Sequence, residues 1–232
     1  MKKFLSVDWD YFVDASLEDR CFKFPDGGNE DLDFQLQNIV WRFRYDDHPE
    51  IKKMGLNEDY NSLMDILTKF LMYDSRNPID SQYKILVGLA ISHKYIYQYI
   101  LDRTHPDEEF EVYNVDFHHD MYYYRDSRNP LNCGNWVREL LKERPNMKYY
   151  WIKREDSEIA LLGGEEIPKE MIVPFKDLID KDFDYIFICR SDIWSPPHLD
   201  KTFNTICRMC KTYARTEVMD KLEESDREIT YK

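Results

Sequence analysis

Residues 112–120 read VYNVDFHHD, an apolar run that ends in four ionisable side chains within five positions. Side chains two positions apart in a strand share a face, so a strand here would place Asp116, His118 and Asp120 on one side and Phe117 and His119 on the other. Two carboxylates and an imidazole on one face suit Mn²⁺ or Zn²⁺, and carboxylate-rich sites favour manganese. The stretch therefore predicts a metal site at a strand end.

Two further apolar segments also end in a potential ligand. Residues 84–93 (KILVGLAISH) close on His93, and residues 183–192 (FDYIFICRSD) close on Asp192. Near-continuous apolar runs are typical of strands buried on both faces, and functional groups gather at the carboxyl ends of parallel strands. We therefore expect His93, Asp192 and the set at 116–120 to meet at one edge of a sheet and to bind metal together.

Strand-like segments alternate with helical segments along the whole chain. We predict strands at 3–13, 84–92, 109–120, 147–153 and 184–192, with shorter candidates at 159–162 and 171–175. We predict helices at 30–43, 60–73, 94–102, 135–142 and 201–224; the first rests on the spacing of Leu32, Leu36, Ile39, Val40 and Phe43. This alternation indicates an α/β fold in three layers, a mostly parallel sheet flanked by helices. The length fits a single domain over residues 1–232.

The composition restricts the classes of partner. With 32 basic and 45 acidic residues the formal net charge is −13, which disfavours nucleic acid, because phosphate binding needs a basic face. An acidic chain agrees in sign with a cationic substrate. No apolar run is long enough to span a bilayer, and the start, MKKFLSVDWDYF, is interrupted by aspartates, unlike a signal peptide. We expect a cytoplasmic protein that contacts no membrane.

The five cysteines do not form a disulfide framework, because they are odd in number and scattered. Cys207 and Cys210 make a single CxxC within a predicted helix, with no second pair to complete a zinc site. We expect reduced cysteines buried by that helix.

Asp8 and Asp10 interrupt the first predicted strand and share a face of it. A buried carboxylate must be paired, hydrogen-bonded or bound to metal. Two interpretations stay open: caps or hydrogen bonds to a neighbouring loop, and a place in the outer shell or substrate rim of the metal site.

These motifs carry a family resemblance. DFHHD at 116–120 resembles the DxHxD motif of the arginase and deacetylase superfamily, and equally the DxHH segment of the zinc histone deacetylases. VGLAISHKYIY at 87–97 is similar to the arginase segment in which a histidine ends a strand, and CRSDIWSPP at 189–197 resembles SxDxD, with Trp194 in place of the second aspartate. GNW at 134–136 looks like the arginase SGNxHG region without its histidine. The order of DWDYF, VDFHHDMYYY and SDIWSPPH most resembles the UPF0489 family, which includes peptide arginases.

The resemblance implies a ligand set for two Mn²⁺ ions. His93 and Asp120 would bind one ion, His118 the other, and Asp116 and Asp192 would bridge them. The deacetylase arrangement would instead hold one Zn²⁺ on Asp116, His118 and Asp192. The substitution at Trp194 leaves open both a two-manganese site and a single-ion site.

The resemblance also implies an activity, the hydrolysis of the guanidinium of peptidyl arginine, or of a small guanidinium substrate, to ornithine or another amine plus urea. Asp120 would orient the attacking hydroxide, and His198, in a PPHLD turn, would shuttle protons or stay a solvated turn residue. A carboxylate must grip the guanidinium, and the candidates are Asp8, Asp10, Asp200 and Glu217. The alternatives are a zinc amidohydrolase that removes acyl groups on the same fold, and a non-catalytic binding protein with a degenerate site.

Overall fold

The computed structural model describes residues 1–24, 34–72, 85–122, 131–161 and 165–220, together with residues 222 and 227. Its six strands are β1 (Lys2–Asp8), β2 (Leu86–Ala90), β3 (Phe110–Val115), β4 (Met147–Ile152), β5 (Tyr185–Cys189) and β6 (Arg215–Val218). All pair in parallel, in the order β4-β3-β1-β5-β2-β6. The six α-helices are α1 (Leu17–Lys23), α2 (Phe34–Asp47), α3 (Asp59–Met72), α4 (Tyr95–Leu101), α5 (Trp136–Glu143) and α6 (Asp200–Tyr213).

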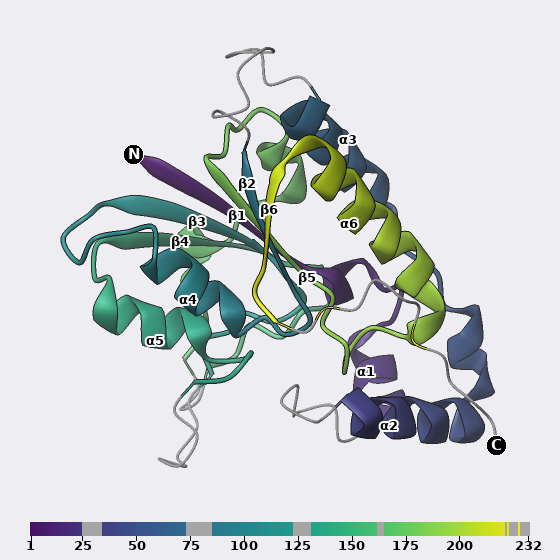
Figure 1. Cartoon of the computed structure of the whole chain (residues 1–232). Coiled ribbons are helices and arrows are strands. Elements are labelled where there is room, and N and C mark those ends of the chain that lie inside the picture. The colour runs from purple at the N-terminus through teal and green to yellow at the C-terminus, as the bar shows by residue number, and fades with distance from the viewer. Residues whose placement is uncertain are drawn as a thin grey trace.

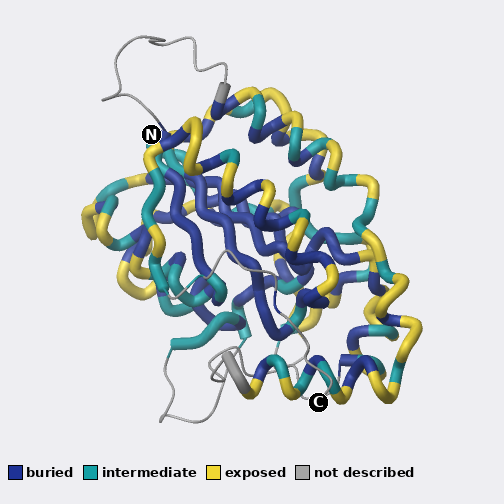
Figure 2. The backbone as a smooth tube through the Cα atoms, turned by 45° about the vertical axis from the view of Figure 1, so that its right-hand side comes forward, coloured by how far each residue is buried: buried dark blue, intermediate teal, exposed yellow. Residues whose placement is uncertain are grey.

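Helices cover both faces of the sheet, which confirms the three-layer α/β prediction (Figure 1). The α3 and α6 helices pack on one face with a short 3-10 helix, Phe175–Leu178, while α4 and α5 pack on the other. The strands between these layers are buried and the outer helix surfaces are exposed (Figure 2). Burial on both faces explains why the strands read as continuous apolar runs rather than alternating ones.

The strand register aligns the carboxyl ends of β1, β2, β3 and β5. Asp8 of β1 lies opposite Cys189 of β5, Ala90 of β2 lies opposite the same Cys189, and Val7 lies opposite Val115 of β3. The segments that follow β1, β2, β3 and β5 therefore leave the sheet at one level along its carboxyl edge. Helices α1 and α2 lie beyond this edge (Figure 1).

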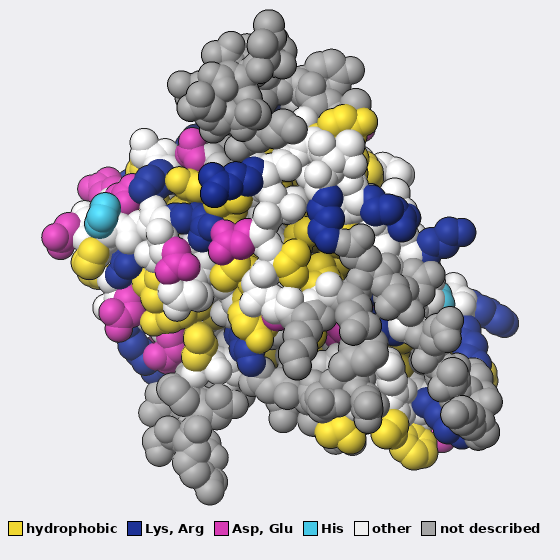
Figure 3. All heavy atoms as spheres, viewed as in Figure 1, with side chains coloured by type: hydrophobic (Ala, Val, Ile, Leu, Met, Phe, Trp, Pro, Cys, Tyr) yellow, Lys and Arg dark blue, Asp and Glu magenta, His cyan; other side chains and the backbone are white. Residues whose placement is uncertain are grey.

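The side of α2 that faces the protein combines the aromatic Trp41 and Tyr45 with the polar Gln37 and Arg44. Trp41 Nε1 donates to the Asp192 carbonyl oxygen at 2.7 Å, and the Arg44 guanidinium donates to the carbonyl of Ile193. The apolar residues that predicted this helix, Leu36, Ile39 and Phe43, are exposed instead, and hydrophobic atoms show at the surface over α2 (Figure 3). Spacing thus predicted the helix, but buried carbonyls that need donors decide which side faces inward. Leu32 and the predicted start at 30–33 lie outside the described residues.

Four other boundaries differ from prediction. The first strand stops at Asp8 and a 3-10 turn, Trp9–Phe12, replaces its second half; the third strand stops at Val115, before the ionisable set. The last helix ends at Tyr213, because the chain turns back to add β6 at the edge beside β2. Residues 159–161 and 171–175 make only isolated bridges and 3-10 turns, and residue 162 lies outside the described residues.

Two further predictions concern the cysteines of α6 and membrane-spanning helices. Cys207 and Cys210 are buried in α6 as free thiols, as expected. In the described part of the chain no helix combines the length and apolarity needed to cross a membrane.

Gly88, in the middle of β2, tests the packing between the sheet and α4. A Cβ there would lie 2.7 Å from a Tyr99 ring carbon and 2.8 Å from one of Phe187, both buried. We expect Gly88→Ala to lower the free energy of unfolding by about 1–3 kcal/mol through overpacking. Gly55→Ala is the matched control, since nothing lies within 4 Å of its added Cβ, and it should stay within about 0.5 kcal/mol of wild type. Equal urea midpoints for the two variants would contradict this packing.

Candidate metal centre

Two overlapping groups of carboxylates and histidines lie at the carboxyl edge of the sheet. One consists of Asp8, His93 and Asp116 and is fully buried; the other consists of Asp10, Asp116 and His118. They come from the end of β1 and its 3-10 turn, from the loop after β2, and from the loop after β3. Within each group the potential ligand atoms lie within 4.8 Å of one another, so each group can hold a metal ion. We call them group A and group B.

In group A one nitrogen faces both carboxylates of the group and also Asp120, a predicted ligand that belongs to neither group. His93 Nδ1 lies 3.2 Å from Asp8 Oδ2, 3.0 Å from Asp116 Oδ2 and 3.0 Å from Asp120 Oδ2. The ring is fixed from its other side by Ser6 Oγ, 2.8 Å from Nε2. A single proton on Nδ1 cannot satisfy three buried carboxylates, whereas a divalent cation can bind several at once.

The close approach of these carboxylates to His93 determines which side chains carry protons. Burial opposes a charged imidazole at His93, but the close carboxylates of Asp116, Asp120 and Asp8 outweigh it and raise its pKa well above the ordinary value. Burial, followed by the charge of Asp116, raises the pKa of Asp120. Burial also raises the pKa of Asp8, and the charges of Asp10 and Asp116 add to the effect. Metal-free group A thus retains protons that a cation would displace.

Group B is formed by the turn after β1 and the loop after β3. His118 Nδ1 lies 3.3 Å from Asp10 Oδ2 and 3.7 Å from Asp116 Oδ1. Asp10 is buried, and its second oxygen, Oδ1, has no hydrogen-bond partner among the described residues. An unsatisfied buried carboxylate oxygen beside an imidazole and a second carboxylate fits a cation.

Asp116 belongs to both groups. Its Oδ2 faces His93 and its Oδ1 faces His118. The carboxylate is held by the His118 backbone N–H, 2.8 Å from Oδ1, and by Asn114 Nδ2, 3.3 Å from Oδ2. Burial opposes ionisation of Asp116, but hydrogen bonds to His118 and His93 outweigh it and hold its pKa far below the ordinary value. A carboxylate with one oxygen toward each imidazole has the geometry of a bridge between two cations.

Neighbouring side chains fix the loop that carries these ligands. Trp136 Nε1 donates to Asp120 Oδ2 at 2.5 Å, and Asp120 adopts a left-handed φ of 53°. His119 Nδ1 accepts from the Met121 N–H at 3.0 Å, so its Nε2 carries the proton and faces the Ala160 carbonyl oxygen at 3.3 Å. Burial lowers the pKa of His119 to about 4. A neutral His119 thus supports the loop and lies outside both groups.

The loop, rather than strand alternation, brings Asp116 and His118 together. The predicted strand to 120 is wrong, because β3 ends at Val115 and Asp116 accepts a hydrogen bond from the N–H two residues on. Such a turn is typical of aspartate. His119 is still separated from Asp116 and His118, as predicted, but the loop conformation causes this separation and not strand alternation.

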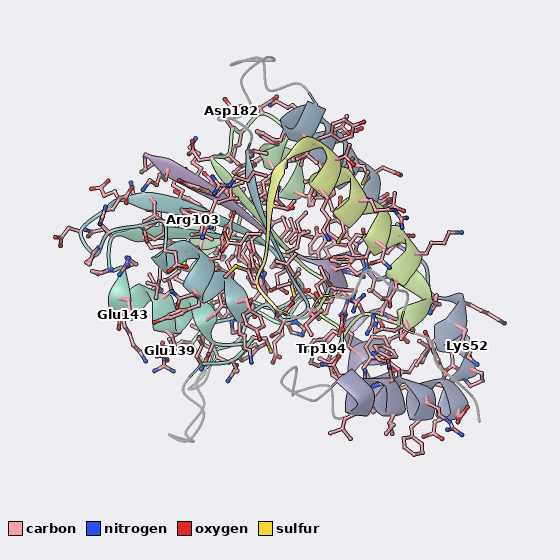
Figure 4. The ribbon with its side chains drawn as sticks, viewed as in Figure 1. Lys52, Arg103, Glu139, Glu143, Asp182 and Trp194 are labelled. Atoms are coloured by element: carbon pink, nitrogen blue, oxygen red, sulfur yellow. The ribbon has the colours of Figure 1, made fainter. Side chains whose placement is uncertain are left out.

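Asp192, expected to bridge two ions, is engaged elsewhere. It is buried, and Arg190 binds both of its oxygens, with Nη2 3.0 Å from Oδ2. Asp192 is part of neither group. The next motif position, Trp194, lies between α2 and the sheet edge (Figure 4), with its ring centroid 5.0 Å from that of His118.

The other predicted site residues lie outside the two groups. Asp200 pairs with Arg227, at 2.6 Å between Oδ1 and Nη2, and Glu217 pairs with Arg103. His198 Nδ1 lies 2.7 Å from the Tyr45 hydroxyl, and its Nε2 lies 2.8 Å from the Met54 carbonyl oxygen. These contacts bind the loop after β5 and the edge strand β6 to their surroundings.

For Asp8 and Asp10 the sequence left open a capping role and a place in the outer shell or substrate rim. Asp8 does cap the 3-10 turn, because its Oδ1 accepts from the Asp10 N–H at 3.1 Å, and each aspartate is also a potential ligand in one of the two groups. The signal was present, since two aspartates within an apolar strand need partners. What the sequence did not reveal is that β1 lies between β3 and β5, which places its end beside Asp116.

The sequence matches no protein-family model, and no curated protein or solved structure matches it.

Asp116 and Asp192 can be distinguished by metal binding. Asp116→Asn should abolish divalent-metal binding at both groups, because it removes the shared charge. Asp192→Asn should retain the metal and lower stability by about 3 kcal/mol, because it leaves Arg190 buried beside a neutral amide. Equilibrium dialysis with elemental analysis measures the metal, and circular dichroism shows that each variant is folded. Metal loss in Asp192→Asn with the fold retained would return that residue to the ligand set.

Asp220, just beyond β6, holds the loop that leads to His93. Its Oδ2 accepts from the Ile91 N–H at 2.8 Å. Burial raises the pKa of Asp220 from 3.8 to about 6. The folded protein therefore binds a proton here more tightly than the unfolded chain does.

The sign of this linkage gives a pH prediction. The stabilising proton is fully present below the unfolded pKa of 3.8 and is lost as pH rises through about 6. Between pH 5 and pH 7 this residue should cost about 1 kcal/mol of unfolding free energy, after discounting for its partial exposure. Asp220→Asn keeps the acceptor oxygen and should lose less stability than wild type over that interval in urea titrations. Equal pH slopes would show that Asp220 does not titrate there.

Proposed function

We propose that the chain is a divalent-metal-dependent hydrolase of the arginase-like class, which converts peptidyl arginine to ornithine and urea. The observation that carries the proposal is the Asp116 carboxylate, with one oxygen toward His93 and the other toward His118. A shared carboxylate between two ligand groups is the arrangement that two-metal hydrolases use. The resemblance of residues 116–120 to the DxHxD motif supports the same class.

The ligand types favour manganese. The two groups together offer Asp8, Asp10, Asp116, His93 and His118, three carboxylates and two imidazoles, without a thiolate. Oxygen-rich sites with some imidazole suit Mn²⁺, whereas thiolate-rich sites select zinc or copper. We therefore propose two Mn²⁺ ions as the cofactor.

The metal ions and the side chains of the protein would have different roles in the reaction. Bound divalent ions lower the pKa of water and so supply a nucleophile at neutral pH. Asp120, fixed by the Trp136 indole and adjacent to His93, would orient the attacking water. Addition of that water to the guanidinium carbon and cleavage of one C–N bond release urea, and the departing nitrogen takes up a proton to become the ornithine amine.

The substrate is expected to be cationic. The net charge of −13 favours approach of a guanidinium, and the half-buried Trp194 ring beside His118 offers a surface for cation–π contact. Asp200 and Glu217 are occupied by arginines, so neither can grip the substrate without breaking an ion pair. Trp194 also stands where the arginase motif has its second aspartate, and this favours a different substrate contact from that of free arginine.

A second candidate is a zinc amidohydrolase. Group B by itself has two carboxylates and one imidazole, and His118 is its one member that is not fully buried. Three protein ligands with an open position are typical of catalytic zinc. This reading predicts one Zn²⁺ per chain and the release of acetate from acetylated amines.

The deciding experiment compares metals and products. Metal-stripped protein is loaded with Mn²⁺ or Zn²⁺ and incubated with arginine peptides and, separately, acetyl-lysine peptides. The proposal predicts a loss of about 42 Da from arginine peptides, because a carbodiimide unit leaves as urea. Loss of an acetyl group also changes the mass by about 42 Da, so urea and acetate must be measured directly.

Asp116→Asn is the matched control, since it should abolish urea release while the chain stays folded. Acetate release with zinc alone would favour the amidohydrolase. A chain that binds neither Mn²⁺ nor Zn²⁺ would be a non-catalytic binding protein, and that result would reject both enzymes.

A further inference from the structure

Arg20 contributes a buried cation to group B. Its Nη1 lies 3.2 Å from Asp10 Oδ2, the same oxygen that lies 3.3 Å from His118 Nδ1. Arg20 is 3% exposed, so water screens its charge little. Asp10 Oδ2 in group B is thus already paired with the positive charge of Arg20.

Arg20 cannot easily move away when an ion enters. Its Nη2 donates to the Asp10 carbonyl oxygen at 2.6 Å and to the Val13 carbonyl oxygen at 3.4 Å. The guanidinium carbon lies 4.0 Å from the centroid of the Phe117 ring. Helix α1, which carries Arg20, begins at a capping box between Ser16 and Asp19. These contacts fix the guanidinium beside Asp10.

Group A has no comparable cation. In the part of the chain that the structure describes, the ion pairs of Asp8, Asp116 and Asp120 are all with histidines. Three carboxylates face His93, whereas only Asp10 and Asp116 face His118. The surroundings of the two imidazoles therefore differ by one carboxylate, Asp120, and by one buried guanidinium, and both differences favour a cation in group A.

We propose that Arg20 is a built-in counter-cation of Asp10 that weakens the binding of the second divalent ion, so that group A fills first and group B fills only at higher metal concentration. The inference rests on the proposed function in one respect, that divalent ions bind at both groups. It adds an order of loading and names the residue that sets it. A neutral side chain at position 20 would leave the Asp10 charge uncompensated and would tighten the second site.

The test is a Mn²⁺ titration of metal-stripped, full-length protein by calorimetry, followed by electron paramagnetic resonance at one and two equivalents. Wild type should show two dissociation constants at least tenfold apart, with an uncoupled six-line signal at one equivalent and a spin-coupled signal at two. His93→Ala should lose the tight site and His118→Ala the weak one. Equal constants, or loss of the tight site in His118→Ala, would overturn the loading order.

Substitutions at position 20 test the residue itself. Arg20→Met keeps the aliphatic contact with Phe117 and should tighten the second constant at least tenfold, while the first stays within threefold. Arg20→Gln is a second neutral variant that can still donate to the Asp10 carbonyl, and Arg20→Lys keeps the charge and should resemble wild type. Folding is checked by circular dichroism before each titration. A second constant that is unchanged or weaker in a folded neutral variant contradicts the role of Arg20.

A double substitution shows whether the effect acts through Asp10. Asp10→Asn should weaken the second site, and adding Arg20→Met to it should give no further tightening, because the paired charge is gone. Tightening of the same size in both backgrounds would contradict the pairing. Absence of any Mn²⁺ binding in wild type would instead reject the proposed function, and the two failures are thereby distinguished.

Discussion

The convergence of carboxylates around His93 is the constraint on which the site depends. Three aspartates face one imidazole nitrogen in a pocket where His93 is 1% exposed. Such an arrangement is costly without a cation, because like charges repel strongly at low dielectric. The surrounding donors, Trp136 to Asp120 and Asn114 to Asp116, hold the carboxylates in place against that repulsion. The pocket is thus built for a positive charge rather than for local stability.

The parallel sheet makes this convergence possible. Register brings the ends of β1, β2, β3 and β5 to one level, so side chains distant in sequence meet without long excursions. Two described non-glycine residues at the same edge have a left-handed φ, Asp120 (53°) after β3 and Ser191 (55°) after β5. Strain of this kind persists only where surrounding contacts determine it, which for Asp120 are the Trp136 indole and the loop supported by His119.

The fold class could be predicted from sequence because strands buried on both faces leave uninterrupted apolar runs, as in residues 84–92. The spatial order of the strands could not, because no local pattern states which strands are neighbours, and this order decides that Asp8 and Asp10 lie beside Asp116. The edge strand β6 was hidden for a related reason, since its residues 215–218 are partly exposed and carry no apolar run. The side of α2 that faces inward was also beyond reach, because it depends on carbonyls of the distant loop after β5.

The two carboxylates that flank Asp116 come from the end of β1 and not from the loop after β5. That loop carries Arg190 two residues before Asp192 and Trp194 two residues after it. Arg190 neutralises Asp192 by binding both of its oxygens, which removes the carboxylate charge on that side. Asp8 and Asp10, at the end of the adjacent strand β1, provide two carboxylates toward Asp116 instead. Two carboxylates at the end of β1 thus lie beside the shared aspartate, while the Trp194 ring lies beside that of His118.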